Sequence, residues 1–384
     1  MSLPKMDVAG RLSRLRALLE PAGVDALLVA SRSNLRYLTG FTGSAGMLLA
    51  TLDGAFLATD GRYQDQAGDE LARAGVHAEV SIGNPPAQLA AIVDAAGGLG
   101  RVGFESEHLS FAHHARFTAG DAFGPDRLVP LGGLVEGLRK IKDAGELARI
   151  RAAAGIADDA LAAVIAQLEE WFSGGGGITE ADLAVELDFQ MRRRGASEPA
   201  FETIVAGGPN GAMPHHRASA DRLEPHQPIV IDFGATVEGY RSDMTRTVWV
   251  GDLADGEQER IVAVVTSSQL AGVAAVKAAV EARAVDAACR EVIDAAGWVD
   301  AFMHGTGHGV GLDIHEAPWV GASSEEWLEV GNVVTVEPGV YLPGVGGVRI
   351  EDTVVVTSGG CEVLTRAPKQ AVKDGRDGAV GTTL

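Results

Sequence analysis

Residues 228–250 read PIVIDFGATVEGYRSDMTRTVWV, and much of the architecture can be worked out from this stretch. Its ends, Pro228–Phe233 and Arg246–Val250, are apolar runs rich in β-branched residues, which predicts two strands divided by a glycine-containing turn. Asp232 interrupts the first run, and Asp243 stands shortly before the second. Because a buried carboxylate is costly unless a cation compensates it, these acids predict a charged site on a buried sheet.

Two further acids and a histidine extend this pattern. Glu337 ends the apolar run Val-Thr-Val, and Glu351 follows Val-Arg-Ile. His308 lies in residues 304–316, HGTGHGVGLDIHE, where glycines let the backbone approach a ligand. Four carboxylates and one imidazole, without a thiolate, predict a site for two divalent cations, and this donor set suits manganese, cobalt or zinc.

The buried acids are also compatible with two structural roles. Each carboxylate taken alone is accounted for by a structural ion pair with Arg241, Arg246 or Arg349. A single structural zinc ion would also use such ligands. Two ions that share carboxylates generate a nucleophile near neutral pH and polarise a carbonyl, so the complete set favours a hydrolase.

The composition excludes several classes of protein. The chain of 384 residues is 46% hydrophobic and 22% charged, so it can bury a large core, and its length predicts two domains. Acidic residues outnumber basic ones, 52 to 32, and the net charge of -20 argues against nucleic acid as a partner. No apolar run reaches about 18 residues, which argues against a membrane span. With two cysteines and no signal-peptide pattern, we expect a cytoplasmic protein.

The first third of the chain alternates helical and strand patterns. A helix is predicted over Arg11–Leu19, with strands at 26–30, 47–51 and 54–59. The glycine-rich stretch 131–138 predicts the end of this part. We therefore expect a small α/β domain over residues 1–138, a second domain over 139–370, and a polar tail over 371–384.

The second domain begins with helical patterns and continues with strands. Asp143 and Glu146 are the residue types of a capping box. Helices are predicted near 144–157, 160–172, 179–194, 256–282 and 284–296, and strands at 201–206, 228–233, 246–250, 333–337, 348–351 and 353–356. This order predicts an α+β fold in which helices pack on a mostly antiparallel sheet.

In this order, the acids and His308 resemble the M24 metallopeptidase family, whose members have the pita-bread fold with its curved sheet: methionine aminopeptidases, Xaa-Pro aminopeptidases (aminopeptidase P) and Xaa-Pro dipeptidases (prolidases). The resemblance spans the whole second domain. It implies that Asp232 binds one ion, that His308 and Glu337 bind the other, and that Asp243 and Glu351 bridge the two.

The resemblance also implies roles in catalysis. A hydroxide that bridges the ions attacks the peptide bond, and Glu337 takes its proton as general base. His315 hydrogen-bonds the substrate carbonyl and stabilises the oxyanion. His215, in Asn-Gly-Ala-Met-Pro-His, matches a histidine on the substrate side, and His304 matches one beside the proline ring.

Other residues are implied to support the site or to lie outside it. Tyr341 and Arg349 match a network that orients the ligands. Four histidines match no family position and are expected to be ordinary surface or loop residues: His113, His114, His216 and His226.

The first domain narrows the choice within the family. Residues 34–46, NLRYLTGFTGSAG, and 59–63, TDGRY, resemble the amino-terminal creatinase/prolidase-like domain of Xaa-Pro aminopeptidases and prolidases. Methionine aminopeptidases lack this domain. Creatinase has it but works without metal, and the complete ligand set of this chain disfavours creatinase.

The substrate is predicted from one position beyond the histidine stretch. Many prolidases have an arginine there, which binds the free carboxylate of a dipeptide, whereas this chain has Trp319. The sequence therefore favours an Xaa-Pro aminopeptidase, which acts on peptides with proline at the second position, and an Xaa-Pro dipeptidase is the alternative. A non-catalytic peptide-binding module of the same fold is disfavoured because all five ligands are present. The resemblance also implies a homodimer.

Overall fold

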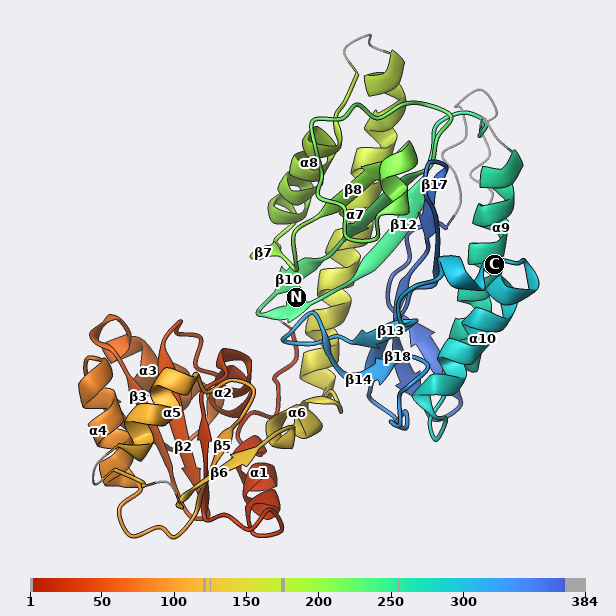
Figure 1. Cartoon of the computed structure of the whole chain (residues 1–384). Helices are drawn as coiled ribbons and strands as arrows, with labels where there is room; N and C mark the ends of the chain where they lie inside the picture. The colour runs from red at the N-terminus through yellow and green to blue at the C-terminus, as the bar shows by residue number, and fades with distance from the viewer. Residues whose placement is uncertain (1–2, 120–121, 125, 174–176, 254–255, 370–384) are drawn as a thin grey trace. The chain divides into compact units, whose positions relative to one another are not determined.

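The chain divides into two compact units. The computed structural model describes residues 3–119, 122–124, 126–173, 177–253 and 256–369 (Figure 1). One unit is Lys5–Arg139, and the other begins at Lys140 and includes Leu3 and Pro4. The division after Arg139 differs by one residue from the boundary expected after residue 138, and the expected tail at 371–384 lies outside the described residues.

The first unit is a six-stranded mixed sheet with helices. The strand order is β4-β3-β2-β1-β5-β6, in which β1 is antiparallel to β2 and parallel to β5. All four residues of β1 are buried, which fits a central strand covered on both faces. Its elements are α1 Arg11–Leu19, β1 Ala26–Val29, α2 Arg32–Thr39, β2 Gly46–Thr51, β3 Ala55–Thr59, η1 Gly61–Tyr63, α3 Gln64–Ala74, β4 Glu79–Ile82, α4 Pro85–Ala95, β5 Val102–Glu105, α5 Phe111–Thr118, β6 Leu128–Leu131 and α6 Leu134–Arg139.

The second unit combines helices with antiparallel strands, as the α+β prediction requires. Its helices are α7 Ala144–Ser173, α8 Glu180–Arg193, η2 Gly208–Ala212, α9 Gly256–Ala275, α10 Ala282–Ala295 and η3 Val299–Ala301. Its strands are β7 Glu198–Pro199, β8 Ile204–Gly207, β9 Ile229–Phe233, β10 Ala235–Val237, β11 Tyr240–Arg241, β12 Met244–Val248, β13 Gly307–Gly309, β14 Glu316–Val320, β15 Val333–Val336, β16 Gly339–Leu342, β17 Gly346–Arg349, β18 Asp352–Thr357 and β19 Gly360–Val363.

The prediction of two separate helices at 144–157 and 160–172 is wrong, because α7 is one helix of 30 residues. Its start is the predicted capping box: Glu146 N donates to Asp143 Oδ1 at 2.8 Å, and Asp143 N donates to Glu146 Oε2 at 2.9 Å. Beyond the first turn its only glycine is Gly155, and a single glycine costs about 1 kcal/mol, which is too little to end a helix that packs along its length.

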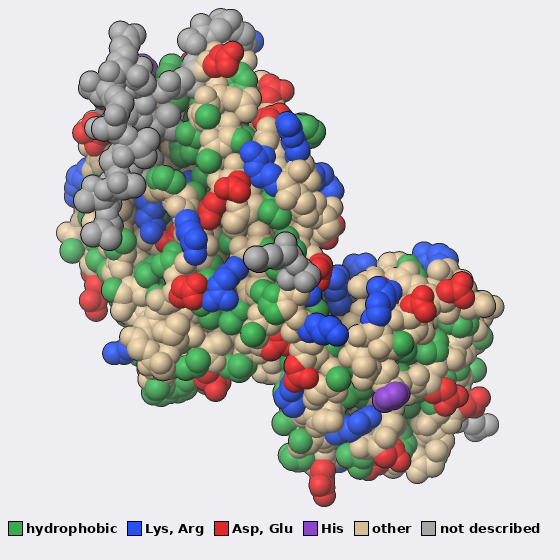
Figure 2. Space-filling model, turned by 180° about the vertical axis from the view of Figure 1, so that it is seen from behind, with side chains coloured by type: hydrophobic (Ala, Val, Ile, Leu, Met, Phe, Trp, Pro, Cys, Tyr) green, Lys and Arg blue, Asp and Glu red, His purple; other side chains and the backbone are tan. Residues whose placement is uncertain are grey.

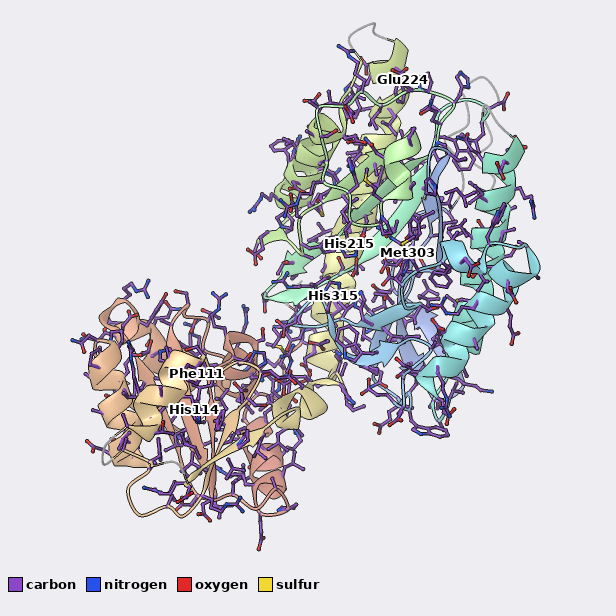
Figure 3. All side chains as sticks on the ribbon, viewed as in Figure 1. Phe111, His114, His215, Glu224, Met303 and His315 are labelled. Atoms are coloured by element: carbon purple, nitrogen blue, oxygen red, sulfur yellow. The ribbon has the colours of Figure 1, made fainter. Side chains whose placement is uncertain are left out.

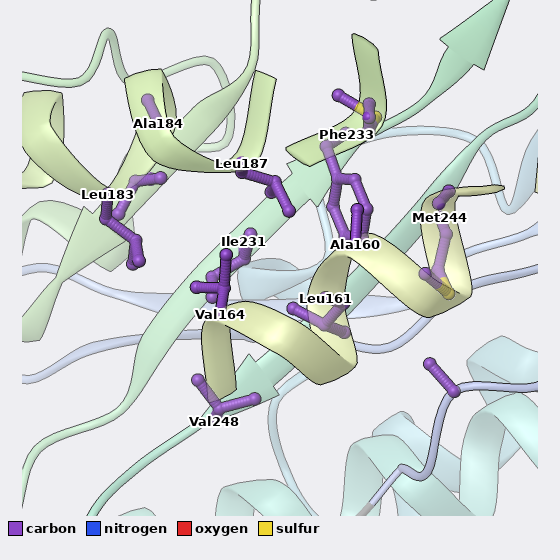
Figure 4. Packing of buried hydrophobic residues seen from close by; sticks show 14 of the residues in the cluster. Ala160, Leu161, Val164, Leu183, Ala184, Leu187, Ile231, Phe233, Met244 and Val248 are labelled. Atoms are coloured by element: carbon purple, nitrogen blue, oxygen red, sulfur yellow. The ribbon is translucent and has the colours of Figure 1, made fainter. Parts of the chain in front are cut away.

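Buried residues of α7 and α8 pack on one face of the sheet formed by β12, β9 and β8. Leu161 and Leu187 belong to this hydrophobic core, as do Ile231 and Phe233 of β9 (Figure 4). Side chains alternate along a strand, so Asp232 lies on the opposite face of β9. The helices therefore cover one face of the sheet and leave the other for polar residues.

A second core packs α9 and α10 against the sheet of order β14-β13-β15-β18-β19. Val334 and Val336 of β15 point into it, and so do Val348 and Ile350 near β17. By the same alternation, Glu337 and Glu351 lie on the face away from this core.

Charged side chains and helix hydropathy describe the surface and the helices. Acidic and basic side chains are interspersed over the face shown in Figure 2. None of the helices in the described part of the chain is long and apolar enough to cross a membrane.

Candidate active site

The sheets bring the four predicted acids and His308 into one buried region. Asp232 of β9 lies opposite Thr245 of β12 in the strand register. Thr245 Oγ1 donates to Glu351 Oε2 at 2.8 Å, and Glu351 N donates to Thr245 O at 3.1 Å. Thr245 therefore connects the strand pair that carries Asp232 to the distant segment that carries Glu351.

His308 faces the remaining two acids. Its Nε2 lies 3.2 Å from Glu337 Oε1 and 3.6 Å from Asp243 Oδ2. Thr335 holds this arrangement, since its Oγ1 accepts from His308 N at 3.1 Å and donates to Glu337 Oε1 at 3.2 Å. Candidate ligand atoms of Asp243, His308 and Glu351 all lie within 4.8 Å of one another.

Burial and mutual repulsion determine the pKa values of the acids in this cluster. Burial, followed by the charges of Glu351, Asp232 and Glu337, raises the pKa of Asp243 well above its usual value. Burial, followed by the charges of Glu337 and Asp232, does the same to the pKa of Glu351. Burial also works to raise the pKa of Glu337, but the hydrogen bond and charge of His308, together with the charges of His304 and Arg349, lower that pKa to about 2.

Structural ion pairs explain only part of this crowding. Arg349 Nη2 donates to Asp232 Oδ2 at 2.6 Å, and both side chains are largely buried. Arg246 instead pairs with Asp352 at 2.8 Å, while Arg241 bonds to backbone carbonyls. In the described ranges, no lysine or arginine lies within ion-pair distance of the other three acids, Asp243, Glu337 and Glu351.

The residues present fit bound divalent cations. Asp232 Oδ1 and Glu351 Oε1 are buried and have no hydrogen-bond partner in the part of the chain that the structure describes. An unsatisfied buried carboxylate oxygen costs free energy that a cation would recover. With no arginine for Asp243 or Glu351, an oxygen-rich donor set with one imidazole accounts for the arrangement better than ion pairs do.

His215 and His315 lie at the edge of this cluster and are exposed (Figure 3). The rings of His308 and His315 meet edge to face, with centroids 4.4 Å apart. Burial and the charge of His308 lower the pKa of His315, and the charge of His215 adds to this effect. Trp319 is 53% exposed, and its ring centroid lies 6.4 Å from that of His308.

His304 is connected to the acids through Tyr341. The tyrosine hydroxyl lies 2.8 Å from His304 Nε2 and accepts from Arg349 Nη1 at 2.9 Å. Arg349 also donates from Nε to Thr245 Oγ1 at 3.0 Å. The line from His304 to Asp232 is therefore a continuous set of hydrogen bonds between largely buried groups.

Sequence reasoning did not single out the buried acid Glu180 or its contact with His216. Glu180, at the first position of α8, is fully buried, and His216 Nε2 lies 2.7 Å from its Oε2. His216 lies in a loop, and its side chain is largely buried against Glu180. An acid in the first turn of a helix is commonplace, so nothing local distinguished Glu180, although the adjacent His215-His216 pair was a signal.

Two family models match the chain. Residues 148–358 match Metallopeptidase family M24, and residues 11–141 match the Creatinase/Prolidase N-terminal domain. These matches confirm the family resemblance and the fold predicted from the sequence.

Individual proteins match over nearly the whole chain. An Xaa-Pro dipeptidase of Pyrococcus horikoshii is 32% identical over 374 residues, which are 96% of this chain and 100% of the relative. The structure of an Xaa-Pro dipeptidase from Bacillus anthracis is 38% identical, has a TM-score of 0.87, and is matched over 94% of this chain and 99% of its own. For an X-Pro aminopeptidase from Thermotoga maritima the identity is 33%, the TM-score 0.83, and the coverage 94% and 100%. The chain therefore belongs to metallopeptidase family M24, with an amino-terminal domain of the creatinase/prolidase type.

Proposed function

We propose that this metallopeptidase is an Xaa-Pro dipeptidase that uses two divalent cations. The observation that carries the proposal is the buried cluster of four acids and His308, in which two carboxylate oxygens lack a partner among the described residues. The specificity is taken from the relatives, since two of the three similar proteins named above are Xaa-Pro dipeptidases. This reverses the preference for an aminopeptidase that Trp319 suggested.

An Xaa-Pro aminopeptidase is the second candidate. Trp319 carries no charge for the free carboxylate of a dipeptide, and the Thermotoga maritima relative is an X-Pro aminopeptidase. Both candidates act on a bond whose nitrogen belongs to proline, so general peptidases lose a recognition hydrogen bond there.

The family resemblance supports an assignment of the ligands to the two ions. Asp232 would hold one ion, His308 and Glu337 the other, and Asp243 and Glu351 would be shared between them. When bound, the ions would activate water and polarise the scissile carbonyl. Manganese is the ion we favour, with cobalt and zinc as alternatives, because these metals accept oxygen donors together with one imidazole.

Side chains around the acids supply the remaining chemistry. Glu337 would accept a proton from the attacking water as general base. The lowered pKa of His315 keeps it neutral, so one ring nitrogen is able to donate to the substrate carbonyl as negative charge develops there. His215 would contact the substrate, while His304 would line the proline side.

The test compares substrates after controlled metal replacement. The protein is stripped with a chelator, restored with manganese, cobalt or zinc, and assayed with an Xaa-Pro dipeptide and an Xaa-Pro-Yaa tripeptide, while bound metal is counted by elemental analysis. We expect two ions per chain and cleavage of the dipeptide. Cleavage of the tripeptide alone would establish the aminopeptidase, and cleavage of neither would support a peptide-binding module.

The family resemblance also implies a homodimer, which we propose for this chain. Sedimentation velocity of the metal-loaded protein measures its mass directly. A species with the mass of one chain at micromolar concentration would contradict the dimer.

A further inference from the structure

Glu180 is a buried carboxylate outside the metal cluster that receives five hydrogen bonds. Its Oε1 accepts from Gly207 N at 2.9 Å and Asn210 Nδ2 at 3.0 Å. Its Oε2 accepts from Ser219 N at 3.0 Å, Ser219 Oγ at 2.7 Å and His216 Nε2 at 2.7 Å. Burial works to raise the pKa of Glu180, but these hydrogen bonds together lower it, so the group is ionised at neutral pH.

All these donors belong to one stretch, residues 207–219, which we call the histidine segment. Gly207 and Asn210 lie at its beginning, and His216 and Ser219 lie at its end. His215 stands between the two sets of donors. A single carboxylate therefore ties both ends of the segment that presents His215.

Helix α8 provides a rigid base for this anchor. Leu183 and Leu187 of α8 are completely buried in the core shared with α7 and β9. The backbone amides of Glu180 and Ala181 donate to Asp221 O at 3.0 Å and to Ser219 O at 2.9 Å. Free N–H groups at a helix start need such partners, so the end of the segment is bound to the helix by backbone and side chain together.

The other side of the segment touches the strand that carries Arg349. Arg349 Nη1 donates to Pro214 O at 3.4 Å, one residue before His215. Gly211 and Gly347 pass so closely that a Cβ on Gly347 would lie 1.9 Å from Gly211 O. The segment is thus held between Glu180 and the arginine that binds Asp232.

The His215 side chain has few contacts of its own that fix its position among the described residues. Its side chain is exposed, and its ring makes no hydrogen bond within the described residues. Its neighbour His216 takes the buried position at Glu180. The place of the His215 imidazole relative to His315 therefore depends on the backbone that Glu180 anchors.

We propose that Glu180 is a positioning residue for His215, acting through His216 and the two ends of the histidine segment. This rests on the role proposed above for His215 on the substrate side. Such supporting groups commonly contribute about 10- to 100-fold to activity without touching substrate.

Glu180→Gln tests the proposal because it keeps the shape of the side chain but replaces an acceptor with a donor. We expect kcat/KM for the Xaa-Pro substrate to fall about 10- to 100-fold, with two metal ions still bound. We also expect Glu180→Gln combined with His215→Ala to be no slower than His215→Ala alone, since residues that act as a unit are non-additive. Multiplicative losses in that cycle would overturn the proposal, as would wild-type activity of Glu180→Gln.

Two further variants control for destabilisation of α8 and for misfolding of Glu180→Gln. Asp182→Asn is the matched control, because it weakens the Thr179–Asp182 capping box of the same helix without touching the histidine segment. If the loss of activity in Glu180→Gln is not caused by a less stable helix, Asp182→Asn should leave kcat/KM within about twofold of wild type. His216→Phe keeps a ring but has no donor, so it removes only one of the five hydrogen bonds. It replaces Glu180→Gln if the latter does not fold, with an expected intermediate loss.

Hydrogen exchange gives a readout that does not depend on activity. The amides of residues 207–219 should lose protection in Glu180→Gln and keep it in Asp182→Asn. A wild-type protein that cleaves no Xaa-Pro peptide would refute the proposed function, and exchange would still decide whether Glu180 anchors the segment. Unchanged protection of those amides in Glu180→Gln would refute the anchor.

Discussion

Tyr341 is 1% exposed, and its hydroxyl joins His304 to the arginine that binds Asp232. Tyr341→Phe would leave Nε2 of His304 and one donor of Arg349 without their partner. We expect a loss of about 1–3 kcal/mol in the free energy of unfolding and about 10-fold in kcat/KM, measured by urea denaturation and steady-state kinetics. Tyr37→Phe is the control, since it removes the hydrogen bond to Leu138 O in the other unit and should leave kcat/KM unchanged.

The effect of Asp243→Asn on the melting temperature is expected to depend on pH and on bound metal. Burial and three neighbouring acids raise its pKa in the folded state, so it destabilises the fold as pH rises above the unfolded value near 4. In chelator-treated protein at pH 7, Asp243→Asn should therefore raise the melting temperature. The gain should shrink as pH falls towards 4 and disappear below about pH 3, where both states are protonated.

Metal reverses the sign of that effect. With manganese present, Asp243→Asn should bind fewer than two ions, melt below the wild-type protein and lose turnover, because a shared ligand is gone. Thermal melts with and without chelator measure both the stabilisation in the absence of metal and the destabilisation in its presence. A variant that keeps two ions and full activity would rule out Asp243 as a ligand.

At the level of helices, replacing a glycine by alanine is expected to change the stability of the protein in opposite directions in α7 and α9. A Cβ added at Gly155 meets nothing within 4 Å, whereas at Gly272 it would lie 2.3 Å from Cys289 Sγ and 2.7 Å from Val336 Cγ1. Gly155→Ala should stabilise the protein by about 0.5–1 kcal/mol through helix propensity. Gly272→Ala should destabilise it by about 1–3 kcal/mol through overpacking. Urea denaturation at constant metal concentration measures both, and equal signs would contradict the packing of α9 on α10.

The strands differ in how well the sequence indicates them. β9, β12, β15 and β18 are β-branched runs and were predicted near their observed positions. β13 is only Gly307–Gly309 and has no strand propensity of its own. It exists because β14 and β15 pair with its two sides, which is a contact between distant residues. Such strands are decided by pairing and not by local preference.

At the scale of the whole molecule, each unit has its own hydrophobic core, and the four candidate acids and His308 all belong to the second unit. Cations that bind only the folded second unit should stabilise that unit alone, by about 2.7 kcal/mol at a free concentration 100 times the Kd. Differential scanning calorimetry should therefore show two transitions, of which a chelator lowers only one. A single transition that shifts as a whole would show that the two units unfold together.

The apolar patterns and the family resemblance in the sequence were sufficient to propose which residues form the site. Asp232 interrupts an apolar strand, and Glu337 and Glu351 each follow an apolar residue, so the period of two places these three side chains on the face opposite the core. Asp243 stands just before the strand Met244–Val248. The fold class and family followed from the same pattern.

The tertiary structure added what depends on contacts between distant residues. It placed Glu351 beside Thr245, paired Arg349 and not Arg246 with Asp232, and tied Glu180 to the segment that carries His215. None of these contacts joins residues that are close in sequence. Strand pairing and helix packing set them, and no local pattern of residue types encodes which of several arginines or acids will meet.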